Sequence, residues 1–304
     1  MSNSYVFYDG QIMDEDNVNL SIRSKAFNYG LGCFEGIRAY FDEEDEQLYA
    51  FRLKEHYDRF LNSCKVLYLN IPYNCEQLCN ITIELLRKNN FKTTTYIRPV
   101  AYKGSNGLNP SLLDEDNRLA IYCTPMGRFA GKEEMSVAIT SWQRISGNAL
   151  PARTKATAAY LNSALASLEV LQNGFDEALF LTDKGYVCEG PGENIFMVKN
   201  GKLITPPPSD DILEGITRDT VMKIAKEEFG IDTVERSISR AEIYGADEVF
   251  FSGTAMEVTP IIYIDRRIIG SGKTGEISQK IKDIYMTITK GKNPKYANYC
   301  TPVY

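Results

Sequence analysis

One lysine lies among small residues, directly ahead of a stretch with helical periodicity. Residues 151–162 read Pro-Ala-Arg-Thr-Lys-Ala-Thr-Ala-Ala-Tyr-Leu-Asn, with Lys155 near the centre. Apolar residues recur at helical spacing from Ala159 to Asn173, and Gly174 is well placed as a C-terminal cap, so Lys155 precedes the helix. A desolvated lysine can have a depressed pKa and can attack a carbonyl to form a Schiff base. On this stretch alone, an ordinary loop lysine is the simpler interpretation.

A glycine-bracketed glutamate forms the second informative stretch. Residues 189–196 read Glu-Gly-Pro-Gly-Glu-Asn-Ile-Phe. Lys155, Tyr160 and Glu189 in this setting are similar to the fold-type IV pyridoxal-phosphate enzymes. The resemblance is strongest to the branched-chain aminotransferases and covers residues 27–281. A run of this length is a specific motif, whereas a lone lysine is not.

The resemblance implies pyridoxal 5'-phosphate as the cofactor, with no metal. It makes Lys155 the catalytic amine and Schiff-base residue, Glu189 the anion facing the pyridine nitrogen, and Tyr160 the donor at the ring hydroxyl. Arg59, which alone reads as a solvated arginine, becomes the phosphate ligand, and a guanidinium fork suits a dianion. The other implied cofactor-binding residues are Asn194, Leu213, Gly215, Ile216, Thr217 and Thr254, with Glu193 expected to help orient the site.

The resemblance also implies a substrate pocket. Arg98 lies in an apolar, strand-like run where a structural ion pair is the alternative, and the family makes it a carboxylate reader. The family commonly has tryptophan where Met126 stands and tyrosine where Phe129 stands. Each difference removes a hydrogen-bonding group from the side chain. The implied substrate-binding residues are Tyr29, Phe34, Tyr96, Arg98, Phe129, Thr254 and Ala255.

The implied reaction is a ping-pong transamination between branched-chain L-amino acids and 2-oxoglutarate. Its substrates and products are L-leucine, L-isoleucine, L-valine, L-glutamate and their 2-oxo acids, and the expected role is branched-chain amino acid biosynthesis. D-amino-acid aminotransferases typically carry histidine where this chain has Val100. Aminodeoxychorismate lyases typically lack the Glu-Gly-x-Gly-Glu-Asn form. Those two activities, and a silent binding relative, are the alternatives.

A length of 304 residues suits two domains. The resemblance implies an α+β, two-domain fold-type IV architecture of the D-amino-acid-aminotransferase type, with the cofactor between the domains. We expect a smaller N-terminal α/β sandwich-like domain over 1–124, a linker over 125–134, and a larger C-terminal cofactor-binding domain with a pseudo-barrel over 135–304. Family members share active-site residues across a dimer interface, which implies a homodimer or a higher oligomer such as a hexamer.

Composition excludes several other classes of function. The net charge is −6 and the basic residues are scattered, which disfavours a nucleic-acid partner. No apolar run approaches the ~20 residues that span a bilayer, and residues 1–5 show no signal-peptide pattern, so we expect a cytoplasmic protein without membrane contact. One histidine, His56, and seven cysteines without paired spacing disfavour a metal site.

Periodicity predicts the elements that must position these residues. Thr217 reads as the N-cap of a helix that Gly230 ends, and residues 239–242 read as a capping box. A hairpin is expected over 5–12, and the tail 291–304 has aromatic residues but no periodicity. We expect helices over 53–67, 76–90, 159–173, 217–229 and 274–290, and strands over 37–41, 93–102, 119–124, 135–141, 177–182, 195–199, 203–205, 247–252 and 258–264.

Overall fold

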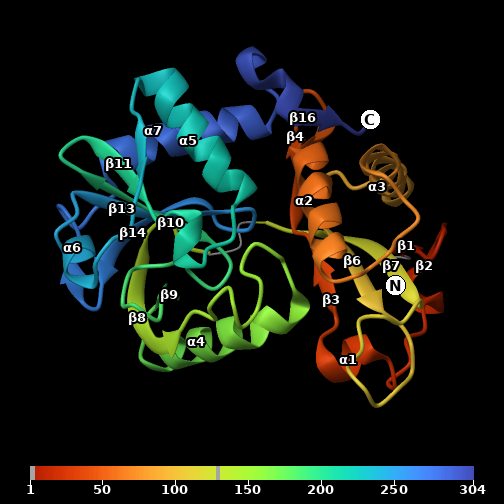
Figure 1. The fold of residues 1–304 in the computed structure, drawn as a ribbon. Helices are drawn as coiled ribbons and strands as arrows, with labels where there is room; N and C mark the ends of the chain where they lie inside the picture. The colour runs from red at the N-terminus through yellow and green to blue at the C-terminus, as the bar shows by residue number, and fades with distance from the viewer. Residues whose placement is uncertain (1–3, 128–130) are drawn as a thin grey trace. The chain divides into compact units, whose positions relative to one another are not determined.

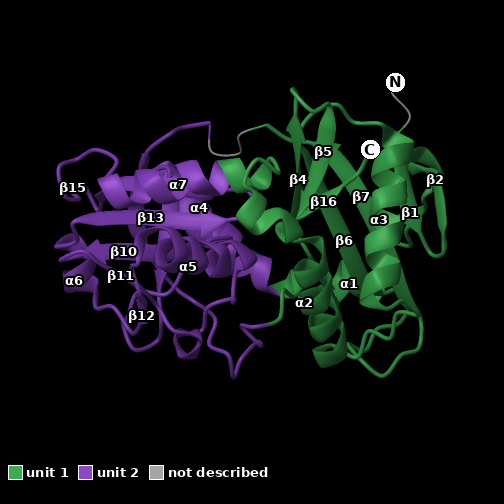
Figure 2. Ribbon diagram, turned by 90° about the horizontal axis from the view of Figure 1, so that it is seen from above, with its two compact units in different colours: residues 1–127, 154–158, 287–304 green, residues 128–153, 159–286 purple. Residues whose placement is uncertain are grey.

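The computed structural model describes residues 4–127 and 131–304. It divides into two compact units, coloured separately in Figure 2. Unit 1 contains residues 1–127, 154–158 and 287–304, and unit 2 contains residues 128–153 and 159–286. Each unit therefore gathers segments that are distant in the sequence, and the domain boundaries expected from the sequence stay a prediction.

Unit 1 is built on an antiparallel sheet with the strand order β16-β5-β4-β6-β7-β1-β2, to which β3 adds by pairing with β6. The predicted hairpin is present as β1 and β2. The strands are β1 (Tyr5–Tyr8), β2 (Gln11–Asp14), β3 (Gly32–Phe34), β4 (Ile37–Asp42), β5 (Gln47–Phe51), β6 (Thr95–Lys103), β7 (Asn117–Pro125) and β16 (Cys300–Pro302).

Helices α2 (Leu53–Val66) and α3 (Cys75–Asn89) pack against this sheet (Figure 1). The apolar face of α2 supplies Tyr57 and Phe60, which are fully buried in the core. Asn74 caps α3 through a capping box with Gln77, which explains its sharp start. Two further short helices belong to unit 1, α1 (Lys25–Tyr29) and the 3-10 turn η1 (Glu15–Asn17).

The C-terminal tail packs on unit 1. After the 3-10 helix η4 (Pro294–Tyr299), strand β16 pairs with β5 and places Val303 in the core. Lys292 forms an ion pair with Asp42 at 2.8 Å. The tail is therefore an edge strand of the sheet and a source of core contacts.

Unit 2 is built on a mixed sheet with the strand order β12-β11-β10-β13-β14-β8-β9, and β15 pairs with β14. The pairs β11·β12, β14·β8 and β8·β9 are parallel, and the others are antiparallel. The strands are β8 (Met135–Gln143), β9 (Glu177–Leu181), β10 (Asn194–Lys199), β11 (Lys202–Thr205), β12 (Thr233–Glu235), β13 (Glu248–Gly253), β14 (Glu257–Ile264) and β15 (Arg267–Ile268).

The predicted helices and strands are confirmed to within two residues at each end. One cap prediction is wrong: Gly215, and not Thr217, is the N-cap of α5, and Thr217 lies in the first turn. Gly230 ends α5 with a φ of 66°, as predicted. The remaining helices are α4 (Tyr160–Gln172), α5 (Ile216–Phe229), α6 (Arg240–Tyr244) and α7 (Glu276–Thr289), with 3-10 turns η2 (Thr157–Ala159) and η3 (Pro208–Asp210).

Helix α4 turns its leucine stripe to solvent. Leu161, Leu168 and Leu171 are 69%, 54% and 58% exposed, whereas Ala166 and Val170 are buried. Small and β-branched side chains let α4 approach strands β8 and β9 closely, and the larger leucines remain outside. None of the helices in the described ranges combines the length and apolar character needed to cross a bilayer.

Candidate active site

The segment 154–158 belongs to unit 1, and its backbone is fixed on both sides of Lys155. The Lys155 N–H donates to Oγ of Ser63 at 3.3 Å, and its carbonyl accepts from the Phe34 N–H at 3.1 Å. Ala156 forms an isolated β-bridge with Cys33. Residues 154–158 therefore lie beside β3. The backbone position from which the Lys155 side chain extends is fixed by these contacts.

Three predicted substrate residues gather around this lysine. The Lys155 Nζ lies 5.3 Å from the centroid of the Phe34 ring, and the Arg98 Cζ lies 4.4 Å from the same centroid. Nη2 of Arg98 donates to the hydroxyl of Tyr96 at 2.7 Å. Two cations on one aromatic ring form a surface that attracts carboxylates and also offers apolar area. Unit 1 thus brings Lys155, Phe34, Tyr96 and Arg98 together.

Two other predicted substrate residues are not placed in this group. The Tyr29 hydroxyl donates to the carbonyl of Leu108 at 2.6 Å, in an exposed part of unit 1. Phe129 lies outside the described residues, so its predicted role stays a prediction. Met126 donates its N–H to the carbonyl of Thr94 at 2.9 Å and continues the edge of the sheet.

Arg59, the predicted phosphate ligand, is held by a buried carboxylate. Its Nε and Nη2 donate to the two oxygens of Glu35 at 2.7 and 2.8 Å. His56 places Nδ1 2.9 Å from Oε2 of Glu35. Burial alone would raise the pKa of Glu35, but the charge of Arg59 and the hydrogen bonds of His56 and Arg59 outweigh it and hold that pKa well below its usual range. Arg59 therefore lies in a strongly charged, ordered environment.

Glu189 is held in unit 2 by three donors. Arg144 Nη2 lies 2.8 Å from Oε1, while Asn194 Nδ2 and the Leu213 N–H donate to Oε2 at 3.1 and 3.0 Å. Burial would lower the pKa of Arg144, but Glu189 and, more weakly, Cys188 and Tyr160 raise it. The two carboxylate oxygens therefore have fixed directions, as an anion paired with a pyridinium requires.

The start of α5 adjoins this carboxylate. Asn194 also donates to the Leu213 carbonyl at 2.8 Å, so one amide joins Glu189 to the turn before the helix. A Cβ at Gly215 would lie 2.1 Å from Oδ1 of Asn194, which requires glycine there. The N-cap of α5 is Gly215, which has no side chain to cap the helix, and Thr217 is buried in the first turn. The N-terminus of a helix is suited to an anion.

The end of β13 presents a buried hydroxyl beside the same strands. Ser252 is 1% exposed, and its Oγ has no hydrogen-bond partner among the described residues. Ser252 pairs in register with Asn194, and Thr254 and Ala255 follow in the half-buried turn to β14. A buried hydroxyl without a protein partner indicates a position where a ligand or water binds.

Glu193 differs from Glu189 although both belong to one motif. The Gly192 N–H donates to Oε2 of Glu193 at 3.0 Å, while Oε1 has no partner in the described part of the chain. Burial, followed by repulsion from Glu177, raises its pKa well above the usual value. Glu193 therefore holds its proton more tightly than an ordinary glutamic acid does, and it packs against the backbone that carries Glu189.

Each unit by itself carries groups of the kinds that pyridoxal phosphate needs. Unit 1 has an amine at Lys155 and a guanidinium at Arg59. Unit 2 has an oriented anion at Glu189, the start of α5 at Gly215 and, at Ser252, a hydroxyl without a partner among the described residues. Amine, pyridine anion and phosphate donors are the three kinds of group that this cofactor needs. Tyr160 lies at the start of α4, within electrostatic range of Arg144.

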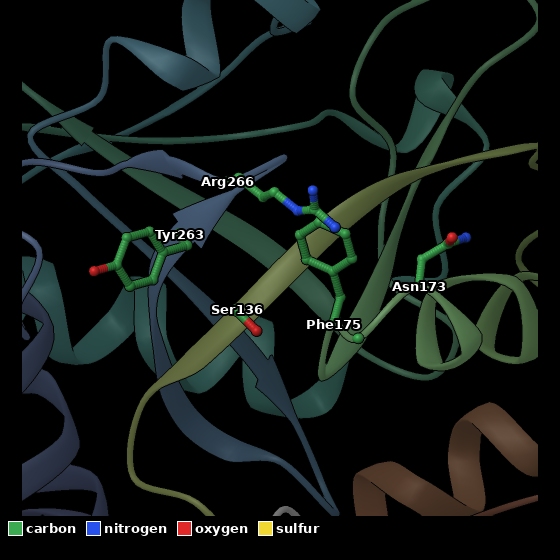
Figure 3. A pocket seen from close by; sticks show the side chains of 6 residues that line it. Ser136, Asn173, Phe175, Tyr263 and Arg266 are labelled. Atoms are coloured by element: carbon green, nitrogen blue, oxygen red, sulfur yellow. The ribbon is translucent and has the colours of Figure 1, made fainter.

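A surface pocket elsewhere on unit 2 contains none of the predicted site residues (Figure 3). It encloses about 250 Å³ between β8, β14 and the end of α4. The Arg266 guanidinium lies over the Phe175 ring, with Cζ 5.6 Å from the centroid. The residues lining this pocket include no buried charged side chain, and their main interaction is the cation–π contact between Arg266 and Phe175. Its lining residues are Ser136, Asn173, Gly174, Phe175, Tyr263 and Arg266.

Comparison with known proteins agrees with this geometry. The family model described as amino-transferase class IV matches residues 32–264. The chain belongs to this family. The match covers both units and includes every predicted site residue except Tyr29. The predicted family and the predicted α+β fold-type IV class are confirmed.

Relatives in this family match over the whole chain. A probable branched-chain-amino-acid aminotransferase of Aquifex aeolicus is 45% identical over 100% of this chain and 98% of its own. The branched-chain aminotransferase of Thermoproteus uzoniensis, solved with norvaline, has a TM-score of 0.95 at 45% identity, with 99% and 100% coverage. The T.th. branched-chain amino acid aminotransferase, solved with N-(5'-phosphopyridoxyl)-L-glutamate, has a TM-score of 0.93 at 37% identity, with 99% coverage of both chains.

Sequence analysis missed three residues of this class IV aminotransferase. Glu35 and Arg144 hold Arg59 and Glu189, and Ser252 presents the unpartnered hydroxyl. Glu35 lies in residues 30–36, which read Gly-Leu-Gly-Cys-Phe-Glu-Gly, and a lone acid among these glycines gives no signal of its partner. Ser252 lies two residues before Thr254, a predicted site residue. This closeness in the sequence is the signal that could have identified it.

Proposed function

We propose that this aminotransferase moves the amino group between branched-chain L-amino acids and 2-oxoglutarate, giving branched-chain 2-oxo acids and L-glutamate, with pyridoxal 5'-phosphate as cofactor. The observation that carries this function is the full-length match to branched-chain aminotransferases at 45% identity, together with the ordered Lys155 and Glu189. One structural relative holds a phosphopyridoxyl-glutamate, which joins this cofactor to this substrate class. The predicted activity and cofactor are confirmed.

We assign the cofactor contacts as follows. When bound, pyridoxal phosphate supplies an electron sink for the negative charge that develops at the substrate α carbon. Glu189, whose carboxylate is oriented by Asn194 and Leu213, would hold a proton on the pyridine nitrogen. Arg59 is the guanidinium that would bind the phosphate, and the start of α5 is a second position suited to an anion. The hydroxyl of Tyr160 would donate to the ring oxygen.

Lys155 carries the proton. Its Nζ would take the proton from the substrate α carbon and deliver it to the cofactor carbon that carries the amino group away, which a neutral amine can do. The backbone hydrogen bonds to Ser63 and Phe34 fix the position from which the side chain extends. Lys155 is therefore the one group in this chain to which we assign proton transfer at carbon.

The substrate side must accept an aliphatic chain and a second carboxylate in turn. Phe34 supplies apolar area for leucine, isoleucine or valine, and Arg98 supplies charge for the distal carboxylate of glutamate. Tyr96 holds the Arg98 guanidinium through the bond at 2.7 Å. Because the Arg98 guanidinium lies over aromatic rings, one surface can offer both a positive charge for a carboxylate and apolar area for an aliphatic side chain.

The near-visible absorbance spectrum tests this function. A bound cofactor band should shift when L-leucine is added and return with 2-oxoglutarate. Lys155→Ala should abolish turnover, because it removes the amine that we propose takes the proton from the substrate α carbon. A shift with D-alanine alone would favour D-amino-acid transamination, and full turnover by Lys155→Ala would overturn the assignment.

We also propose that the chain works as a homodimer or a higher homo-oligomer in the cytoplasm. The support is a set of exposed apolar side chains on unit 1, together with the α4 leucine stripe on unit 2, because such surfaces on a folded protein mark interfaces. Light scattering should give a multiple of the monomer mass, and Phe27→Ser should lower it. The unit 1 set is Leu20, Ile22, Phe27, Leu108 and Leu113.

A further inference from the structure

One buried carboxylate holds the guanidinium of Arg59 through two parallel hydrogen bonds. Nε donates to Oε1 of Glu35 at 2.7 Å, and Nη2 donates to Oε2 at 2.8 Å. The Glu35 side chain is 0% exposed, while Arg59 retains 14%. A bidentate pair fixes both the direction and the plane of the fork, so Glu35 determines how Arg59 is presented.

A third side chain fixes the carboxylate itself. His56 lies one helical turn before Arg59 on α2, and its Nδ1 is 2.9 Å from Oε2 of Glu35. Burial lowers the pKa of His56, so the imidazole is neutral and donates Nδ1–H to Glu35. The cluster therefore contains one anion and one cation, and His56 adds a hydrogen bond without adding charge.

Glu35 also lies beside the lysine segment. It occupies the turn between β3 and β4, where its N–H donates to the carbonyl of Pro99 at 3.0 Å. The preceding residue, Phe34, donates to the carbonyl of Lys155 at 3.1 Å. Two consecutive residues thus fix the backbone of the amine and the side chain of Arg59, within a single unit of the protein.

We propose that Glu35 is a positioning residue for the cofactor phosphate, acting through Arg59, and that His56 supports Glu35 in this role. The inference rests on the proposed function, because it takes Arg59 as the phosphate ligand. An arginine that is already ordered loses less side-chain entropy when an anion binds. Glu35 therefore strengthens binding of the phosphate although its own charge is negative.

A ratio of two affinities tests this role. The apoenzyme is titrated with pyridoxal 5'-phosphate and with pyridoxal, which lacks the phosphate, and the two dissociation constants are compared. Glu35→Gln should reduce the preference for the phosphorylated compound by roughly 10- to 100-fold, the range typical for loss of a supporting contact. Glu55→Gln, which removes the partner of Arg52 on the same helix, is the matched control and should leave the ratio unchanged.

The outcomes separate this inference from the proposed function. Arg59→Lys should lose the preference for the phosphorylated compound and defines the lower limit. If Arg59→Lys loses it and Glu35→Gln keeps the wild-type ratio, Glu35 is only structural and the inference is overturned. If the wild-type protein shows no preference, or binds no pyridoxal phosphate, the proposed function itself fails.

Two further variants keep the test decisive. Should Glu35→Gln fail to fold, Glu35→Asp keeps the charge but withdraws it by one methylene, and an unchanged ratio in that variant would overturn the inference. His56→Asn keeps a donor toward Glu35 and should retain most of the preference, whereas His56→Leu should lose part of it. Equal ratios in the two His56 variants would remove His56 from the proposal.

Discussion

Two buried glutamates, one in each unit, respond to burial in opposite ways. Glu35 in unit 1 accepts hydrogen bonds from Arg59 and His56, and its pKa lies far below the usual range. Glu193 in unit 2 receives one N–H at Oε2, has no partner at Oε1 among the described residues, and has a strongly raised pKa. Burial is the largest influence on both, so the partners decide which glutamate is charged.

The two units therefore use buried acids differently. In unit 1 the anion of Glu35 orders the Arg59 guanidinium, the group proposed above as the phosphate ligand. In unit 2 Glu189 is paired with Arg144, and burial raises the pKa of its neighbour Glu193. The two acids of one motif thus have different donors: Arg144, Asn194 and the Leu213 N–H for Glu189, and the Gly192 N–H for Glu193.

Removal of the unit 1 anion should have the largest effect on stability. Glu35→Ala leaves the Arg59 guanidinium without its buried partner, and breaking such a pair typically costs about 3–5 kcal/mol. Urea unfolding of the apoenzyme measures this loss. A change below about 1 kcal/mol would show that the pair contributes little to the folded state.

Removal of the unit 2 charge should act on the reaction instead. Glu189→Gln retains the shape and the hydrogen bonds from Asn194 and Leu213 but holds no proton on the pyridine nitrogen. We expect turnover to fall by roughly 10²-fold or more, with cofactor retained. Single-turnover kinetics with L-leucine measure it, and wild-type turnover would refute the role given to Glu189.

The loss of folding stability in acid should depend on Glu35. Its pKa is lower in the folded protein than its usual value of 4.5, so its contribution to stability is present above 4.5 and is lost as the pH falls. The free energy of unfolding of the wild-type apoenzyme should therefore drop in acid more steeply than that of Glu35→Ala. Parallel curves for the two proteins would contradict the charged state assigned to Glu35.

The stability change as the pH rises above 4.5 should depend on Glu193. Its folded pKa lies above 4.5, so its contribution is present below 4.5 and is lost as the pH rises through the folded value. Glu193→Gln cannot ionise, so its stability should fall less as the pH is raised from 4.5, by up to about 1.4 kcal/mol per pH unit. Unfolding curves of both apoenzymes from pH 4.5 upward give this slope difference, and parallel curves would contradict the raised pKa of Glu193.

The smallest effect should come from an acid on the same helix as Arg59. Glu55 is about one-third exposed and binds Arg52 at 2.8 Å. Because water screens the pair, Glu55→Gln should cost about 0–1 kcal/mol. A loss as large as that of Glu35→Ala would mean that burial does not govern the difference between the two acids.

The predictable parts of this molecule are those that local spacing encodes. The periodicity of α2 located Arg59 on a helix, and the motif around Glu189 identified an acid before β10. The partners Glu35 and Arg144 are distant in the sequence, at separations that no local pattern encodes. Motif and periodicity therefore predict candidate ligand residues but not the residues that orient them.

Two local predictions show where spacing stops being informative. Thr217 has the chemistry of an N-cap, yet Gly215 takes that position because Asn194 packs directly against it. In α4 the spacing located the helix correctly, but the side that packs inward is the one with small residues, and Leu161 faces solvent. Close packing decided both cases, and a side chain's own preference did not.

The sheet of unit 1 cannot be completed until its last strand, β16, has been synthesised. Strand β16 covers the edge of β5, although the two are encoded at opposite ends of the chain. At ~5–20 residues per second, a ribosome needs roughly 10–50 s to travel from one to the other. During that interval the nascent chain exposes the unpaired backbone of β5, the kind of edge on which strands of other chains can add. Synthesis of this protein therefore includes a period in which the edge of β5 is open to aggregation.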